Sequence, residues 1–330
     1  MVKKAMQVRF GYVAMSTVIK NASPSRTMTY KQFEKLDDIE AGYRRLERIA
    51  EENLHNTLRL LKHNRMHDIH LYRMSSKLIP LATHQALQDW DPFLYLKPAF
   101  QAIGDYAKQA GMRLSFHPDH FTVFSTPREE VLRNSIRDLE HHVRMLDAMG
   151  LDDCAKNNIH IGGAYGDKAT AGARFIHQFS KLDSRLKRRV TLENDDKTFN
   201  AVETLQISEK LRLPMVLDIH HQWVNNEGEL PHELWPCIAA TWREDHAVLP
   251  PKIHVSSPKS EKDLRGHADY VQVTPLLDFL RAIAPITTHL DVMIEAKMKD
   301  DALFKLMEDL KQYTHDGVTI KDQASVEIKG

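Results

Sequence analysis

Short runs of apolar residues recur along the chain, and longer segments in which apolar and polar positions alternate with a helical period separate them. The short runs are rich in β-branched and aromatic residues, which is typical of buried strands. They predict eight strands, at Gln7–Tyr12, Asp68–Arg73, Met112–Phe116, Asn158–Gly162, Val190–Glu193, Met215–Asp218, Lys252–Val255 and Asp291–Glu295.

The clearest helical segment follows the third predicted strand. Its apolar stripe repeats at spacings of three and four residues, at Leu132, Ile136, Leu139, Val143 and Leu146. Thr126 is the expected N-cap, with Pro127 at the first helical position and Glu129 completing a capping box. Gly150 marks the expected end of this helix.

The regular alternation of strands and helices indicates the fold class. Eight strand–helix units over roughly 295 residues predict a (β/α)8 TIM barrel in the α/β class. A doubly wound open sheet is the alternative, because it can also contain eight strands. The chain shows no linker, repeat or change of composition that would divide it. We therefore expect one barrel domain over residues 1–314 and a polar, loosely held tail over residues 315–330.

Composition narrows the class of protein. The 330 residues contain 45 Lys and Arg and 45 Asp and Glu, so net charge does not indicate a polyanionic partner, although a local basic groove remains compatible with neutrality. The two cysteines, Cys154 and Cys237, form no CxxC motif, which favours a reducing compartment. No segment resembles a signal peptide or reaches the ~20 apolar residues of a membrane span. We expect a cytoplasmic protein without membrane contact.

Histidine is unusually frequent, with 19 residues, and many of them fall where predicted strands end. In a barrel, these ends converge on one site. A lone histidine there is more often a hydrogen-bonded barrel residue than a ligand, and a lone glutamate could pair with Arg or Lys. Together, however, buried acids and histidines would be costly without a cation. The imidazoles and carboxylates predict a centre for Zn²⁺, Mn²⁺ or Fe²⁺. They come from His117, His160, Glu193, Asp218, His220, His221, His254 and Glu295 at strand ends, beside Lys252 and Lys297, and from His84 and His267 in loops.

The number of acidic ligands favours more than one ion. Two ions ~3.5–4 Å apart are the arrangement that holds both oxygens in a phosphoryl displacement. Three loops carry groups suited to phosphates and sugars: Lys20 and Arg26 after the first strand, Arg265 with Lys259 and Lys262 after the seventh, and Tyr165 beside the Gly162-Gly163 turn. Taken alone these could be solvated loops, but above a metal cluster they favour DNA. No GxGxxG, P-loop, HExxH or GxSxG motif is present, so we expect no nucleotide cofactor.

Eight short motifs in series resemble the UV damage endonucleases, a family of metal-dependent (β/α)8 nucleases related in fold to endonuclease IV. They are RFGY, HPDHF, IHIGGAYG, TLENDD, VLDIHH, KIHVSS, GHADYV and VMIEAK. The resemblance implies nicking of UV-damaged double-stranded DNA immediately 5′ to cyclobutane dimers and 6-4 photoproducts. It also implies 3′-hydroxyl and 5′-phosphate products and up to three Mn²⁺ ions, with Zn²⁺, Mg²⁺ or Co²⁺ as alternatives.

The resemblance also implies roles for individual residues. The expected metal ligands are His84, His117, His160, Glu193, Asp218, His221, His254, His267 and Glu295. His221, rather than His220, matches the family ligand, and Lys252 matches a lysine that can be carboxylated. Tyr12 matches an active-site tyrosine near the lesion strand. His120 and Phe121 occupy the positions where some members place Gln-Tyr to probe the damaged pair.

The expected mechanism follows from these roles. Glu193, Asp218 and Glu295 hold the ions, and a metal-activated water attacks the phosphorus 5′ to the lesion. A photodimer stacks poorly, so its extrusion is less costly than that of intact bases, and Phe121 and Tyr12 are candidate wedges. The alternatives are an apurinic endonuclease, a metal-dependent sugar isomerase or epimerase on the same barrel, and a non-catalytic damage-binding protein. A monomer is the simplest expectation.

Overall fold

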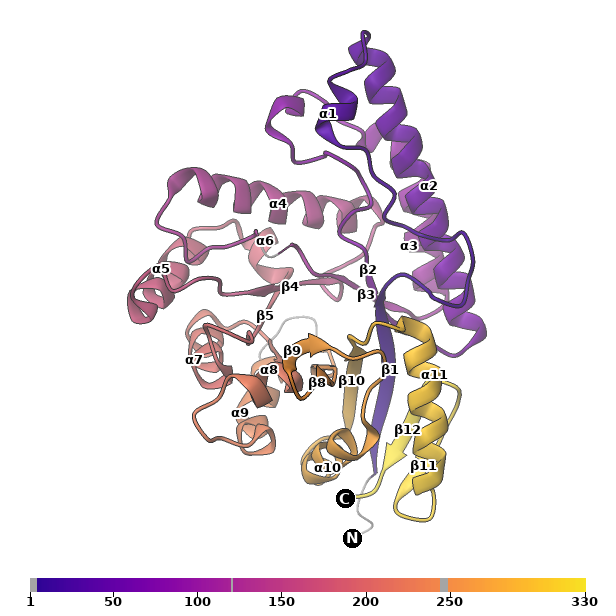
Figure 1. Ribbon diagram of the computed structural model, residues 1–330, viewed down its shortest axis with the longest axis vertical. Coiled ribbons are helices and arrows are strands. Elements are labelled where there is room, and N and C mark those ends of the chain that lie inside the picture. The colour runs from indigo at the N-terminus through magenta and orange to yellow at the C-terminus, as the bar shows by residue number, and fades with distance from the viewer. Residues whose placement is uncertain (1–4, 120, 244–248) are drawn as a thin grey trace.

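A computed structural model describes residues 5–119, 121–243 and 249–330. Its main sheet is a closed barrel of parallel strands (Figure 1). Strands β1 and β10 pair in parallel, from Gln7 opposite His289 to Tyr12 opposite Ile294, which closes the sheet. The (β/α)8 prediction is therefore confirmed and the open-sheet alternative is wrong. The barrel strands are β1 (Met6–Ala14), β2 (Leu71–Met74), β3 (Arg113–Phe116), β4 (Lys156–His160), β5 (Val190–Glu193), β6 (Met215–Asp218), β7 (Lys252–Val255) and β10 (His289–Ile294).

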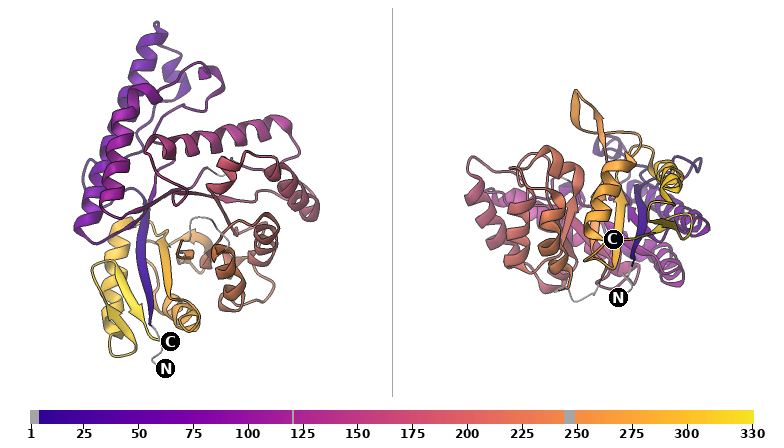
Figure 2. Two further views of the ribbon diagram at one scale, coloured as in Figure 1. Left: turned by 180° about the vertical axis from the view of Figure 1, so that it is seen from behind. Right: turned by 90° about the horizontal axis from the view of Figure 1, so that it is seen from below.

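A helix follows each barrel strand and covers the outside of the barrel (Figures 1 and 2). The main helices are α2 (Ile39–Met66), α3 (Phe93–Gln109), α4 (Glu129–Ala148), α5 (Lys168–Ser180), α7 (Ala201–Leu211), α9 (Pro231–Arg243), α10 (Val273–Ile283) and α11 (Lys299–Leu310). Shorter helical turns lie in the connections, namely α1 (Tyr30–Phe33), η1 (Gln85–Leu87), α6 (Ser184–Arg188), α8 (Ile219–Val224) and η2 (Lys311–Tyr313).

Helix α4 ends as predicted but begins later. Gly150 follows it with a φ of 65°, a conformation that glycine adopts without strain. The expected capping box is wrong, because Arg128 keeps an extended backbone and occupies the N-cap position. The Thr126 hydroxyl instead accepts a hydrogen bond of 3.2 Å from the Arg128 N–H. A local turn thus uses the side chain that would have capped the helix.

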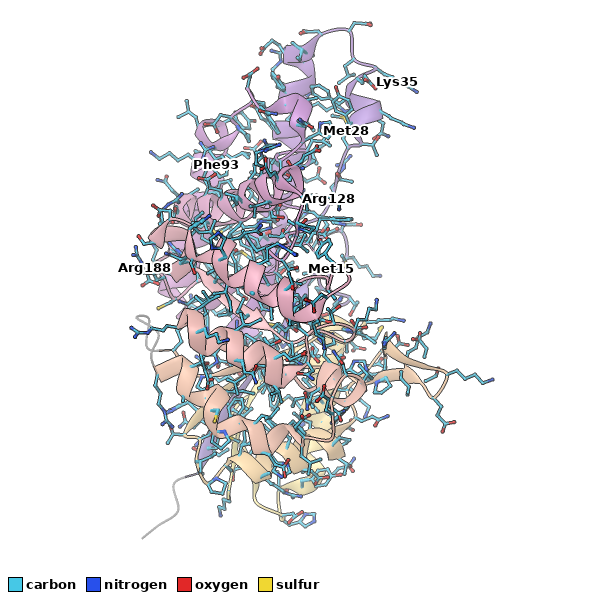
Figure 3. The ribbon with its side chains drawn as sticks, turned by 90° about the vertical axis from the view of Figure 1, so that its left-hand side faces the viewer. Met15, Met28, Lys35, Phe93, Arg128 and Arg188 are labelled. Atoms are coloured by element: carbon cyan, nitrogen blue, oxygen red, sulfur yellow. The ribbon has the colours of Figure 1, made fainter. Side chains whose placement is uncertain are left out.

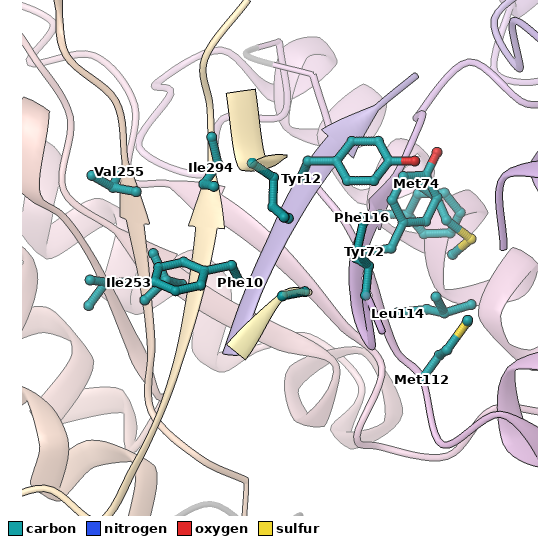
Figure 4. Packing of buried hydrophobic residues seen from close by; sticks show 14 of the residues in the cluster. Phe10, Tyr12, Tyr72, Met74, Met112, Leu114, Phe116, Ile253, Val255 and Ile294 are labelled. Carbon is teal, nitrogen blue, oxygen red and sulfur yellow. The ribbon is translucent and has the colours of Figure 1, made fainter. Parts of the chain in front are cut away.

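The two faces of the barrel strands differ in chemistry. Outward-facing aromatic and aliphatic side chains, including Phe10, Tyr72 and Phe116, are buried against the helices (Figure 4). The barrel interior contains charged side chains near the ends where the parallel strands begin. There Asp291 accepts hydrogen bonds from Arg9 at 2.8 and 2.9 Å and from Arg113 at 2.7 Å. The interior of this barrel is therefore partly polar.

The C-terminal segment differs from the expected loosely held tail. Strands β11 (Val318–Ile320) and β12 (Ser325–Ile328) form an antiparallel hairpin, and β12 pairs with Met6–Arg9 of β1. The short strand β2 pairs only with the later part of β1, from Gly11 to Ala14. Strand β12 therefore occupies an edge of β1 that β2 does not reach, and Val318, Val326 and Ile328 become buried there.

A second hairpin, formed by β8 (Pro258–Ser260) and β9 (Asp263–His267), projects from the end of the barrel where the parallel strands terminate (Figures 2 and 3). It carries the basic residues predicted to face DNA, and it ends at His267. None of the helices in the described part of the chain is long and apolar enough to cross a membrane.

Candidate metal centre

Glu193 lies at the centre of the cluster. It ends β5 with its side chain 1% exposed, and its carboxylate oxygens face different neighbours. Oε2 lies 3.2 Å from Nε2 of His117 and 3.9 Å from Nε2 of His160. Oε1 lies 2.9 Å from Nδ1 of His254. One glutamate therefore lies between His117, which directly follows β3, and the histidines of β4 and β7, which the closed barrel brings together.

Among the residues that the structure describes, two groups of side chains have ligand atoms that all lie within 4.8 Å of one another. The first contains His117, His160 and Glu193, and the second contains Glu193, Asp218, His254 and Glu295. Glu193 belongs to both groups, so its carboxylate is the side chain that they share. Each group combines imidazole nitrogen with carboxylate oxygen, a donor set that suits Zn²⁺ or Mn²⁺.

Four predicted histidine ligands share one orientation. Each has its Nδ1 atom within hydrogen-bond distance of a backbone carbonyl oxygen, which can only accept. The Nδ1 of each ring must therefore donate, and Nε2 remains for a ligand, as in most metal-binding histidines. The contacts are His117 to Pro118 at 2.9 Å, His160 to Glu193 at 3.3 Å, His221 to Asn194 at 2.9 Å and His267 to Glu295 at 2.7 Å.

Burial and charge also fit a cation. Oδ2 of Asp218 is buried and has no hydrogen-bond partner among the described residues. Burial alone would lower the pKa of His254, but the carboxylates of Glu193 and Glu295 raise it to about 9. Burial likewise opposes ionisation of Glu193, yet His254 and His160 hold its pKa well below its usual range. A site that retains protons on histidine in this way stabilises positive charge, and its residues can hold a metal ion.

Side chains that sequence reasoning missed fix the ligands. Asn158 and Arg73 donate to the carboxylates of Glu193 and Glu295, respectively. Asn194 donates to the carbonyl of Asp218 at 3.0 Å and accepts from its N–H at 2.9 Å. Asn158 precedes His160 by two positions and so shares its face of β4, a periodicity that could have identified it.

Lys252 lies two positions before His254, on the same face of β7 and deeper in the barrel. It is buried, and its Nζ lies 3.4 Å from the Ser115 hydroxyl. Burial, together with the nearby Arg113, lowers the pKa of Lys252 well below its usual range. Its amine is thus in an environment that favours the neutral form.

Two histidines of the sequence analysis have other arrangements. His84 is the N-cap of η1, and its Nδ1 accepts from the Ala86 N–H at 3.2 Å while its ring stacks on Tyr30 at 4.1 Å. In the described structure it lies outside both ligand groups, as do the predicted ligands His221 and His267. His220 has both nitrogens engaged, Nδ1 with Ser256 Oγ at 2.5 Å and Nε2 with the Leu264 carbonyl at 2.6 Å. Because neither ring nitrogen of His220 is left for a metal ion, this agrees with the prediction that His221, rather than His220, is the ligand.

The structure does not bring Tyr12 to the cluster. Side chains alternate along β1, and Val13 contacts the interior residues Leu71 and Met293. Tyr12 therefore faces outward, where it is fully buried and its hydroxyl donates to Asn64 of α2 at 2.7 Å (Figure 4). Its expected position beside the lesion strand is wrong, because the strand periodicity directs it to the helix layer.

The predicted DNA-facing residues that the structure describes lie in the segments that follow β1, β3, β4 and β7. Phe121 is 72% exposed and Tyr165 is 42% exposed. Lys20 is exposed, the guanidinium of Arg26 pairs with Glu52, and Arg265 lies 3.7 Å from Asp196. His120 lies outside the described residues.

A cleft of about 500 Å³ lies between the loop after β2 and helix α4. Phe121 and His84 line it, together with Lys77, Asn134 and Arg137. Asp119 and Asp138 also line it, so the cleft combines an exposed aromatic ring with amide groups and with side chains of both charges.

Comparisons with known proteins identify the family of the chain. The model of the UV-endonuclease UvdE family matches residues 8–329. A UV DNA damage endonuclease from Halalkalibacterium halodurans is 44% identical over 98% of this chain and 99% of its own, and one from Bacillus pumilus is 44% identical over 92% and 94%. The crystal structure of SacUVDE matches with a TM-score of 0.81 at 29% identity, over 92% of this chain and 98% of its own. Endonuclease IV from Thermus thermophilus shares the fold, with a TM-score of 0.55 at 12% identity over 92% and 99%. The chain belongs to the UV-endonuclease UvdE family.

Proposed function

We propose that this protein is a metal-dependent DNA repair endonuclease that nicks duplex DNA immediately 5′ to UV photoproducts. The observation that carries the proposal is the pair of buried ligand groups that share Glu193, at the end of the barrel where the exposed loops converge. Membership of the UvdE family supports the substrate class. A site of this kind, formed by the described residues of a single chain, is compatible with action as a monomer.

The candidate site would hold up to three divalent ions, with Mn²⁺ expected and Zn²⁺, Mg²⁺ or Co²⁺ as alternatives. Its carboxylates come from Glu193, Asp218 and Glu295, and its imidazoles from His84, His117, His160, His221, His254 and His267. When bound, such ions lower the pKa of water and neutralise charge on a phosphodiester.

The protein's own residues prepare this chemistry. Backbone carbonyls fix the tautomers of the ligand histidines, and Asn158 and Asn194 orient Glu193 and Asp218. Arg73 balances charge at Glu295. The lowered pKa of Lys252 leaves a neutral amine, the form that carboxylation requires.

Recognition of the lesion would depend on how easily the DNA deforms. A photodimer stacks and pairs poorly, so its removal from the helix costs less than that of intact bases. The cleft between the β2 loop and α4 would receive the extruded nucleotides, and Phe121 at its rim would stack on the gap. Lys20 and Arg265 would contact the backbone, and Tyr165 the sugar edge.

The decisive experiment is nicking of an end-labelled duplex that contains one cyclobutane dimer, with Mn²⁺ and with EDTA. We expect a metal-dependent cut directly 5′ to the dimer and none on an undamaged duplex. Equal or faster cutting at an abasic site would instead identify an apurinic endonuclease. Absence of cutting on every duplex, with metal bound, would contradict the proposal and favour the sugar isomerase alternative.

A further inference from the structure

The loop between β1 and α1, residues 15–29, is held at two separate places, and one of them depends on a buried carboxylate. Asp300, in the first turn of α11, is fully buried although it belongs to no predicted ligand group. We propose that Asp300 is a positioning residue that keeps the first part of this loop in the conformation that receives DNA. The inference rests on the proposed function and adds a residue to it.

The contacts of Asp300 converge on two consecutive loop residues. Its carboxylate accepts hydrogen bonds from the Ser16 hydroxyl and, at 2.9 Å, from the Thr17 N–H. The Thr17 hydroxyl lies 3.2 Å from the carboxylate and 2.8 Å from the Met298 carbonyl. Nε2 of His63 on α2 lies 3.3 Å from Oδ2.

The order then extends along the loop through Ser16. The Ser16 hydroxyl oxygen also accepts hydrogen bonds from the N–H groups of Val18 at 3.0 Å and Ile19 at 2.9 Å. One carboxylate thus fixes the backbone of residues 16–19, immediately before the exposed Lys20. Met15, which is labelled in Figure 3, is the first residue of the loop and directly precedes residues 16–19.

Helix α2 holds the second part of the loop by different contacts. Arg59 donates to the Asn21 carbonyl at 2.7 Å and, at 3.4 Å, to the Lys20 carbonyl at the boundary between the two parts. Asn56 donates to the Ser23 carbonyl at 3.0 Å, and Asn53 accepts from the Arg26 N–H at 2.8 Å. The loop after Asn21 therefore keeps its anchors if Asp300 is changed. This separation makes the role of Asp300 measurable.

The segment that carries Asp300 also connects the loop to the metal centre. It follows Glu295 directly, and the N–H groups of Lys297 and Met298 donate to the carbonyls of Ala268 at 3.0 Å and Asp269 at 3.2 Å. These acceptors come just after His267. Residues 295–300 therefore join the candidate ligand Glu295 to the loop before α1 and to the segment that follows His267.

A simpler role for Asp300 is favourable charge at the N-terminus of a helix. Asp301 provides the comparison, because it lies in the same turn and accepts a hydrogen bond from Tyr270 at 2.9 Å rather than from the first loop. Asp301→Asn removes one carboxylate from that turn and leaves the Ser16 and Thr17 contacts in place. A helix-charge role would affect both variants alike.

The first test measures the loop without DNA. Limited digestion of the folded protein by trypsin should cut after Lys20 about tenfold faster in Asp300→Asn, since cleavage follows local opening. Cleavage after Arg26 should stay unchanged, and Asp301→Asn should behave as the native protein at both positions. Unchanged cleavage after Lys20 in a folded Asp300→Asn would overturn the proposal.

The second test is nicking of the dimer duplex. Asp300→Asn should raise KM by about tenfold with kcat within about twofold, because ordering a loop on binding costs free energy. Loss of a negative charge alone predicts the opposite, tighter binding, and Asp301→Asn measures that effect. A native KM, or a loss confined to kcat, would contradict the positioning role.

Two outcomes need separate variants. If Asp300→Asn does not fold, the double variant Ser16→Ala, Thr17→Val removes the hydroxyl donors from the loop side instead. It should give the same tryptic pattern as expected for Asp300→Asn. A native rate of cleavage after Lys20 in this double variant would again overturn the proposal. If the native protein fails to cut the dimer duplex, the proposed function fails, whereas the digestion still tests the anchor.

Discussion

Nδ1 of His254 lies 2.9 Å from Oε1 of Glu193 and equally close to Oε1 of Glu295. One imidazole thus contacts two carboxylates. Glu193 is the last residue of β5, and Glu295 directly follows the last residue of β10. These strands are not neighbours in the barrel, since β6 and β7 separate them. The contact exists because side chains at the strand ends point into a closed ring, which makes the arrangement suitable for a shared metal centre.

Glu193→Gln should abolish nicking while leaving the fold intact. The substitution keeps the shape of the side chain but removes the charge that both ligand groups share, so we expect a loss of at least about 1000-fold in kcat, the scale of removing a central electrostatic group. Mn²⁺ binding by calorimetry should weaken in parallel. Glu209→Gln, on the exposed face of α7, is the matched control and should retain activity. Native activity in folded, metal-saturated Glu193→Gln would exclude Glu193 as a ligand.

Metal binding should release protons. In the metal-free protein, carboxylates overcome the effect of burial and raise the pKa of His254 and of His221 to about 9 each. Both rings are therefore charged near pH 7, and an ion that binds them must displace protons. Calorimetry of Mn²⁺ binding in buffers with different ionisation enthalpies should detect this release, and His221→Ala should release fewer protons. Buffer-independent heats would contradict it.

The raised pKa values of His254 and His221 also determine how the stability of the metal-free protein changes with pH. Because the folded pKa values lie above the unfolded value of about 6.5, both groups stabilise the metal-free fold fully below that pH. The contribution decreases as the pH rises through about 9. Urea unfolding in EDTA should therefore show lower stability at pH 9 than at pH 6, and a metal-loaded sample should show a smaller difference. A flat profile in EDTA would count against the protonated cluster.

Asp291→Asn should destabilise the barrel by about 3–5 kcal/mol, because it leaves Arg113 buried without its counter-charge. Burial opposes ionisation of Asp291, but Arg113 and Arg9 lower its pKa, so its stabilisation is present at neutral pH and is lost as the pH falls below about 3.9. Chemical denaturation measures the change. Asp316→Asn, which affects the exposed pair with Arg281, should cost less than about 1 kcal/mol. An equal loss of unfolding free energy in the two variants would contradict the expected difference between the buried and the exposed ion pair.

Phe121→Ala should weaken recognition of damaged DNA rather than catalysis. Stacking of a base on an aromatic ring contributes about 1–3 kcal/mol, so KM for the dimer duplex should rise by roughly tenfold with little change in kcat. Leu94→Ala removes another exposed apolar side chain, one that lies on α3, and serves as the control. An unchanged KM would remove Phe121 from the lesion contact.

The sequence alone determined the barrel and placed most of the candidate ligands at the ends of its strands. Strand periodicity identified the barrel strands, and the rule that active sites lie at strand ends grouped His117, His160, Glu193 and Asp218 before their distances were known. These features are local, because each depends on a short apolar run and the polar residue that ends it.

Only the tertiary structure decided which way several side chains face and what holds them. Tyr12 occupies an outward position on β1 and bonds to α2, while His220 uses both ring nitrogens in structural hydrogen bonds. The C-terminal segment became a hairpin because a short β2 leaves part of β1 unpaired. Asp300 reaches Ser16 and Thr17 across most of the chain. Such contacts join residues far apart in sequence, and they depend on strand length, register and barrel closure, which no local pattern encodes.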